Sequence, residues 1–103
     1  MLTTCATSDE AKSLAALLVE QRLAACVTTV PNVASTYRWQ GAVQHEQESL
    51  LVIKTTEAQF AALEQAIRAR SSYELPEVLA IPVHAGSARY LEWLHAAVTE
   101  VEE

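Results

Sequence analysis

The thiol of Cys5 is the side chain in this sequence best placed to do chemistry. It stands two residues before Thr7, where the sequence predicts that a helix begins. The dipole of a helix N-terminus can lower the pKa of a nearby thiol, and a thiolate is both a nucleophile and a ligand for soft metals. The alternative is a small, inert residue buried at the end of a strand. Cys26 lies inside an apolar run, so we expect it to pack in the core.

A second group of polar side chains follows in residues 73–77. Tyr73, Glu74 and Glu77 supply a phenol and two carboxylates, and a split βαβ strand order would place them beside Cys5. Such a group could coordinate a metal or hold a small polar ligand, and a solvated loop anchored by Tyr73 is the alternative interpretation. No pair has the fixed spacing of a zinc site, such as Cys-x-x-Cys or His-x-x-x-His. If this group holds a metal, we predict that its ligands are the thiol of Cys5 and the carboxylate of Glu77.

The three histidines offer Cys5 no convincing partner. His45 lies among polar residues of a predicted strand, His95 lies on a predicted helix, and His84 lies at the far end of the last predicted strand. No serine stands in a G-x-S-x-G nucleophile elbow, and neither of the two glycine-rich phosphate-binding motifs is present. The sequence therefore predicts a protein that is not an enzyme.

Composition and charge narrow the possible partners. The chain has 103 residues, the usual size of one domain, so residues 1–103 are predicted to form a single domain. Seven basic against thirteen acidic residues give a net charge of −6, which would repel nucleic acid. No apolar stretch of ~18 residues occurs, so we expect no membrane partner. Two cysteines, and a start without a basic signal region, predict a reduced, cytoplasmic protein.

Hydrophobic periodicity and capping signals divide the chain into four strands and three helices. Residues 7–10, Thr-Ser-Asp-Glu, match the capping-box pattern of a helix N-terminus, and residues 56–59, Thr-Glu-Ala-Gln, match it as well. Gln40-Gly41 predicts a hairpin turn, because glycine supplies the positive φ that a tight turn requires. The predicted strands are residues 2–6, 25–30 (broken at Pro31-Asn32 and resumed over 34–39), 43–55 and 78–83, and the predicted helices begin near residues 7, 56 and 86. The predicted apolar stripes are Ala11, Leu14, Ala15, Leu17 and Leu18 in the first helix, with Arg22 in its last turn; Phe60, Leu63, Ala66 and Ile67 in the second; and Leu91, Leu94, Val98 and Val101 in the third.

This order, βαββαβ with an added C-terminal helix, predicts an α+β, ferredoxin-like fold. Its sheet places the first and last strands side by side and antiparallel. The continuously apolar residues 50–53 predict the centre of the sheet. Half of the chain is hydrophobic, and a domain this small buries only ~60–70% of its chain surface, so part of the apolar surface is expected to lie between subunits.

Six fragments stand in a recognisable order over nearly the whole chain. They are CATSDE (residues 5–10), LAACV (23–27), STYRWQG (35–41), IKT (53–55), YELPE (73–77) and YLEWL (90–94). Together they resemble the CutA divalent-cation-tolerance family. The resemblance implies a ferredoxin-like subunit, a tight homotrimer and a role in tolerance of copper and other divalent cations. It also implies an architecture similar to the trimeric PII signalling proteins, whose ligands bind in clefts between subunits.

The resemblance also assigns roles to particular residues. Cys5 matches the cysteine that is implicated in the family as a copper ligand. The family often reads His-Pro-Tyr-Glu before the last strand, with the histidine proposed as a further ligand, whereas Ser71 and Ser72 stand at the first two positions here. A hydroxyl is a poorer ligand than an imidazole for copper or zinc, so we expect only modest affinity for copper or another divalent cation.

Two functions are therefore predicted. The first is a non-enzymatic trimeric protein of divalent-metal tolerance and homeostasis that binds cations weakly near Cys5. The second is a PII-like signalling or ligand-binding module, whose cleft between subunits takes a small organic ligand and includes Trp39, Lys54, Tyr73 and Glu74. Lys54 favours an anionic ligand, since a cation in a metal site is counterproductive.

Overall fold

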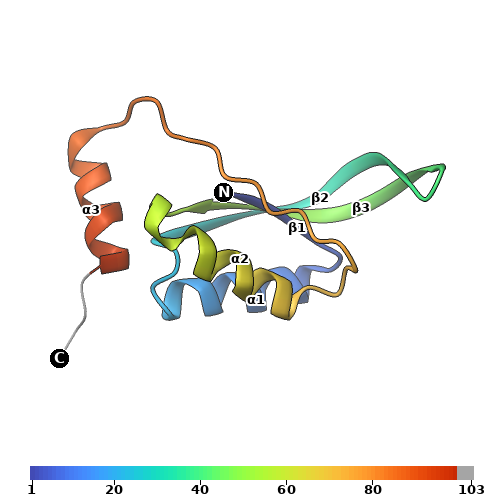
Figure 1. Cartoon of the computed structure of the whole chain (residues 1–103), viewed down its shortest axis with the longest axis horizontal. Helices are drawn as coiled ribbons and strands as arrows, with labels where there is room; N and C mark the ends of the chain where they lie inside the picture. Colours follow the sequence, from blue (N-terminus) through green and yellow to red (C-terminus); the bar gives the residue numbers. More distant parts are fainter. Residues whose placement is uncertain (100–103) are drawn as a thin grey trace.

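Residues 1–99 are described by the computed structural model, an antiparallel sheet of three strands with helices packed on one side (Figure 1). The strands are β1 (Leu2–Cys5), β2 (Cys26–Trp39) and β3 (Ala42–Lys54), in the spatial order β1-β3-β2. The helices are α1 (Ser8–Glu20), α2 (Phe60–Arg70) and α3 (Ala88–Thr99), with a short 3-10 turn, η1 (Glu57–Gln59), before α2. The α+β class predicted from the sequence is confirmed.

Helix α1 begins where the sequence predicts, at a cap formed by Thr7. The Thr7 hydroxyl accepts a hydrogen bond from the backbone N–H of Glu10 at 3.1 Å, which satisfies one of the free donors of the first turn. The Glu10 carboxylate reaches back to the N–H of Ala6, at 3.2 Å, one residue earlier than the predicted partner. The predicted apolar face is buried, through Ala11, Leu14 and Leu18.

Strands β2 and β3 form a long hairpin that extends past the helices (Figure 1). Its predicted turn is confirmed, because φ is 50° at Gln40 and 82° at Gly41, as a type I′ turn requires. The predicted break at Pro31-Asn32 is wrong, since β2 is a single strand whose register shifts at these residues. Asn32 has a φ of 57°, and the resulting bulge bends the strand without ending it.

The core lies between the sheet and the helices α1 and α2. Its fully buried side chains are each at most 2% exposed and include Leu18, Leu51, Ile53, Leu63 and Ile67. The run of residues 50–53 belongs to the central strand β3, as predicted, but only alternate members of it are buried. The reason is that α1 and α2 cover one face of the sheet (Figure 1). We call the opposite face the open face; strand alternation assigns to it Thr4, Gln44, Glu46, Glu48 and Leu50.

The strand predicted over residues 78–83 is reduced to one bridge. Leu79 pairs antiparallel with Leu2, and the N–H of each donates to the carbonyl of the other, at 2.8 and 3.1 Å. The segment therefore lies beside β1, as predicted, but the sheet formed by residues 1–99 has three strands instead of four. Pro76 and Pro82 lack the N–H that a ladder requires, which limits regular pairing on either side of the bridge.

The second helix also begins differently from the prediction. The side chain of Thr56 makes no capping hydrogen bond, and η1 intervenes before α2 begins at Phe60. The predicted apolar face is confirmed at its centre, where Leu63 and Ile67 are buried.

Helix α3 lies at one end of the sheet, away from α2 and α1 (Figure 1). It packs through Leu94 and Val98 on Ala25. Arg22, predicted in the last turn of the first helix, lies beyond its end at Glu20 and donates from Nη1 to the carbonyl of Ala97 at 3.1 Å. The predicted apolar stripe also includes Leu91, which is exposed, and Val101, which lies outside the described residues. Within residues 1–99 no helix is long and apolar enough to cross a membrane.

Candidate functional site

A cavity of about 690 Å³ lies on the open face, between the hairpin and residues 73–77. It forms because β1 ends at Cys5, opposite Ser49, so β3 continues toward the turn without a β1 neighbour. The acidic residues that line the cavity are Glu46, Glu48, Glu74 and Glu77, and the aromatic ones are Tyr37, Trp39 and Tyr73. Of the described residues that line it, none is basic. The cavity is therefore suited to a cation.

Strand register decides which side chains reach this cavity. Glu46 lies opposite Ser35 in the antiparallel pair of β3 and β2, and both line the cavity. Residues two apart on a strand share a face, so Glu46 and Glu48 both stand on the open face, ~6.8 Å apart along β3. Cys5 pairs with Ser49 and belongs to the other face, toward the helices.

Tyr73 fixes residues 71–77 to the sheet. Its hydroxyl donates a hydrogen bond to Oε1 of Glu48 at 2.7 Å. Burial of the phenol, followed by this hydrogen bond and the charge of Glu48, raises the pKa of Tyr73 above its ordinary value of 10. Glu10 Oε2 accepts from the N–H of Ser72 at 3.2 Å, and Ser71 Oγ accepts from the N–H of Tyr73 at 3.0 Å. These contacts agree with the alternative given by the sequence, a loop that is anchored by Tyr73.

The environment of Cys5 is opposite to the one expected at a helix N-terminus. The residue is 2% exposed and packs in the main core. Burial, then the charge of Glu10 and its hydrogen bond with the thiol, and finally the charge of Glu48, raise the pKa of Cys5 to about 11. Of the two interpretations of Cys5, the small residue buried at a strand end agrees with the structure. The lowered pKa of a reactive thiol does not, because burial and two nearby carboxylates outweigh the helix dipole. At neutral pH the thiol is protonated, whereas a metal ligand must be a thiolate.

The residues predicted as a metal site are not brought together. Glu77 lines the cavity on the open face, whereas Cys5 is enclosed in the core behind the sheet. No group of three or more histidine, cysteine, aspartate or glutamate side chains in the described part of the chain is close enough to hold a metal ion. The residues present therefore do not form a preorganised centre for tight metal binding, which needs several convergent ligands.

Three of the four residues predicted to form a ligand cleft do lie together, since Trp39, Tyr73 and Glu74 all line the cavity. Lys54 does not line it. Its Nζ donates to Thr28 Oγ1 at 2.5 Å, and it lies six residues from Glu48 along β3, or ~20 Å. Lys54 therefore does not select an anionic ligand in this cavity, and the carboxylates that line the cavity favour a cation.

Sequence reasoning missed the two glutamates that β3 contributes to the cavity. In the sequence, Glu46 and Glu48 are two of the polar residues around His45 and belong to no recognised motif. A signal was available, because glutamates two residues apart in a hairpin strand must share one face. Only the register with β2 and the position of residues 73–77 show that this face is hollowed into a cavity.

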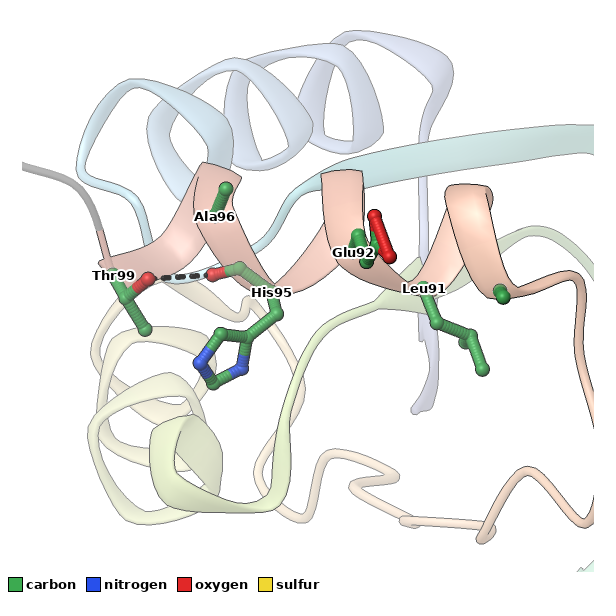
Figure 2. A pocket seen from close by; sticks show the side chains of 6 residues that line it. Leu91, Glu92, His95, Ala96 and Thr99 are labelled. Carbon is green, nitrogen blue, oxygen red and sulfur yellow. Dashed lines mark hydrogen bonds between the residues drawn. The ribbon is translucent and has the colours of Figure 1, made fainter.

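A second, more open hollow of about 500 Å³ lies along α3 (Figure 2). All of its lining residues belong to that helix, and its titratable members are Glu92 and His95. The hydrogen bond drawn in Figure 2 runs from Oγ1 of Thr99 to the carbonyl oxygen of His95, at 2.8 Å. One carboxylate and one imidazole on a single exposed helix do not make a converging set of ligands. The candidate site is therefore the acidic cavity.

The family of this chain follows from comparison with known proteins. A family model described as CutA1 divalent ion tolerance protein matches residues 1–97. The chain belongs to this family. The family is described by tolerance of divalent ions and not by a reaction.

Individual relatives agree with this assignment. The divalent-cation tolerance protein CutA of Thermus thermophilus is 45% identical over 94 residues, which cover 91% of each chain. Protein CutA 1, chloroplastic, of rice (Oryza sativa) is 42% identical over 89% of this chain, which spans 52% of the rice protein. The CutA1 family includes solved structures that superpose closely: the Thermus thermophilus protein (44% identity, TM-score 0.91, 93% of both chains) and the Oryza sativa protein (40%, 0.92, 97% of this chain and 92% of the other).

Proposed function

We propose that this CutA1 family member is a non-enzymatic, cytoplasmic homotrimer of divalent-cation tolerance that binds copper and other divalent cations weakly in the acidic cavity. The observation that carries this proposal is the lining itself, which has the carboxylates of Glu46, Glu48, Glu74 and Glu77 and no basic side chain among its described members. Carboxylates attract divalent cations and coordinate them directly through oxygen. A net charge of −6 strengthens the attraction at a distance.

Weak binding follows from how these carboxylates are placed. No three candidate ligands converge in the part of the chain that the structure describes, so a cation in the cavity keeps most of its water. Glu48 already accepts a hydrogen bond from Tyr73, which occupies one of its oxygens. Cys5, buried and with a raised pKa, is proposed to contribute no thiolate.

Self-association is supported by the distribution of exposed apolar side chains. Most of the large ones lie between residues 75 and 93, namely Leu75, Leu79, Ile81, Val83, Tyr90, Leu91 and Trp93. Leu75, Ile81 and Val83 are 72%, 62% and 69% exposed, which is unusual for a soluble chain without a partner. Leu79 pairs with Leu2, so the part of this segment around Leu79 lies at the β1 side of the sheet, and β2 is the strand at the opposite edge. Pairing of these unlike edges between copies is heterologous, and it closes into a ring when the rotation fits.

A second candidate function is a PII-like module that binds a small organic ligand in the same cavity, at a boundary between subunits. The observation that favours it is the aromatic part of the lining, Tyr37, Trp39 and Tyr73. Aromatic rings are not ligands of divalent metal ions in proteins, whereas sites for organic ligands are commonly lined by aromatic side chains. Leu75 and Glu77 line the cavity and also begin the exposed apolar segment, so the cavity borders the proposed contact between copies.

Calorimetric titration of the assembled protein with Cu(II), followed by Mg(II), tests the cation site. Glu74→Gln removes one lining charge from an exposed loop residue, and Glu57→Gln removes the same charge in η1, away from the cavity. We expect weaker Cu(II) binding by Glu74→Gln, and wild-type binding by Glu57→Gln and by Cys5→Ser. Equal losses of Cu(II) affinity in the two glutamate variants would mean that the general negative charge of the protein, and not the cavity, attracts the ion. A loss of Cu(II) affinity confined to Cys5→Ser would identify the thiol as the ligand and overturn the proposal.

Light scattering tests the assembly independently. We expect a mass of three chains of 11.3 kDa at micromolar concentration. Ile81→Lys places a charge in the proposed contact and should lower that mass, whereas a wild-type protein of single-chain mass would refute the trimer.

A further inference from the structure

The acidic cavity has a pattern more specific than negative charge. Glu46 and Glu48 stand on the same face of β3, and their backbone positions are separated by ~6.8 Å, the spacing of alternate residues in an antiparallel strand. Their carboxylates do not join a third ligand within residues 1–99 to form a metal-sized cluster. Two negative charges held apart along a line fit a ligand with two separated positive charges better than they fit one ion.

Aromatic side chains supply the second part of the pattern. Tyr37 and Trp39 are alternate residues of β2, so they stand on the same face, and both line the cavity. Tyr37 is 40% exposed, which leaves much of its surface accessible to a ligand. The charges of Glu46 and Glu48 contribute to the raised pKa of Tyr37, after desolvation, so this ring lies within their field. Aromatic faces attract organic ammonium groups and cover alkyl chains.

We propose that the cavity binds a short linear aliphatic diamine, or the corresponding part of a longer polyamine, with its two ammonium groups at Glu46 and Glu48. The alkyl chain between them lies against Tyr37 and Trp39. Four or five methylene groups separate two ammonium groups by a length comparable with the spacing of the two glutamates. This inference deepens the proposed function, on which it rests for a cation-binding cavity, and it specifies an organic cation as the ligand that makes use of the whole lining.

The test is calorimetric titration of the assembled protein with putrescine, a four-carbon diamine, in EDTA at constant ionic strength. The matched ligand is n-butylamine, which has the same alkyl chain and one ammonium group. We expect putrescine to bind at least tenfold more tightly than n-butylamine. Glu46→Gln should reduce putrescine affinity at least tenfold and leave n-butylamine nearly unchanged, and Trp39→Leu should weaken both ligands.

Control variants separate a specific site from general attraction. Glu57→Gln, which removes one charge outside the cavity, should bind putrescine as the wild type does. An equal affinity for the diamine and the monoamine, or an equal loss in Glu57→Gln and Glu46→Gln, would overturn the proposal. Far-UV circular dichroism of each variant establishes that it is folded before titration.

Titrations of the same variants with Cu(II), in buffer without EDTA, distinguish this inference from the proposed function. Binding of Cu(II) that depends on Glu74, without selective binding of putrescine, would refute the diamine site and keep the metal-tolerance proposal. Selective putrescine binding without Cu(II) binding would refute metal binding in the cavity and support the diamine site. Binding of neither ligand would refute both.

Discussion

Substitution of Leu51 by aspartate is the most direct test of how the chain folds. Leu51 is 0% exposed and lies on the central strand, between Thr3 of β1 and Thr29 of β2. Truncating a buried leucine to alanine costs about 2–5 kcal/mol, through lost burial and the cavity left behind. An unpaired carboxylate in the same place costs several kcal/mol more. The total is comparable with the whole stability of a domain, about 5–15 kcal/mol, so Leu51→Asp should not fold.

A graded series makes the magnitude measurable. Leu51→Ala should lower Tm by at least about 8 °C, since the cost is about 2 kcal/mol or more and 1 kcal/mol corresponds to roughly 4–8 °C in a domain of this size. Val43→Ala, on the same strand but 52% exposed, should change Tm by only a few degrees. Circular dichroism melts must use one protein concentration, because the stability of an oligomer depends on it. If Leu51→Asp melted within a few degrees of wild type, the placement of the core under β3 would be wrong.

Three further predictions concern single polar groups. The folded protein raises the pKa of Cys5 from its ordinary 9 to about 11, so the protonated thiol stabilises the fold below pH 9 and this contribution is lost as the pH rises toward 11. The Tm of Cys5→Ala should therefore fall less than that of the wild type between pH 9 and pH 11. An identical fall in both proteins would contradict the raised pKa of Cys5. Thr7→Ala should lower the free energy of unfolding in urea by about 0.5–2 kcal/mol, whereas Thr56→Ala, which removes no cap, should cost less; equal losses would argue against the cap. Thr3 is 0% exposed and its hydroxyl has no hydrogen-bond partner within the described residues, so Thr3→Val should stabilise by about 1 kcal/mol, and a lower urea midpoint would count against this.

The sequence did not predict which polar and reactive side chains face the core and which line the cavity. The sequence places Cys5 two residues before a helix cap, a position compatible with a reactive thiol and with a small buried residue. Pairing with Ser49 turns the side chain toward the helices, where burial and Glu10 raise its pKa. Lys54 and Glu48 share a strand but lie far apart along it, so only one of them lines the cavity. The sequence predicted which residues share a strand, whereas pairing with distant segments decided which side chains of different strands and loops meet.

Local features were determined by the sequence itself. The Thr7 cap, the Gln40-Gly41 turn and the apolar faces of α1 and α2 each depend on side chains within a few residues of one another, so their energetics are already present in a short segment. The α+β class followed from the order of these segments. The family could be predicted because six fragments extend over nearly the whole chain.

Tertiary structure alone decided the features that depend on pairing between distant segments. The bulge at Pro31-Asn32 lets β2 continue, because the neighbouring strand β3 keeps its hydrogen bonds on both sides. The last predicted strand became a single bridge at Leu79, since flanking prolines cannot donate to β1. The acidic cavity exists because β1 is shorter than β3 and residues 73–77 occupy the edge beyond its end. A one-residue change of register would exchange the faces of the sheet, so no local pattern determines which residues meet there.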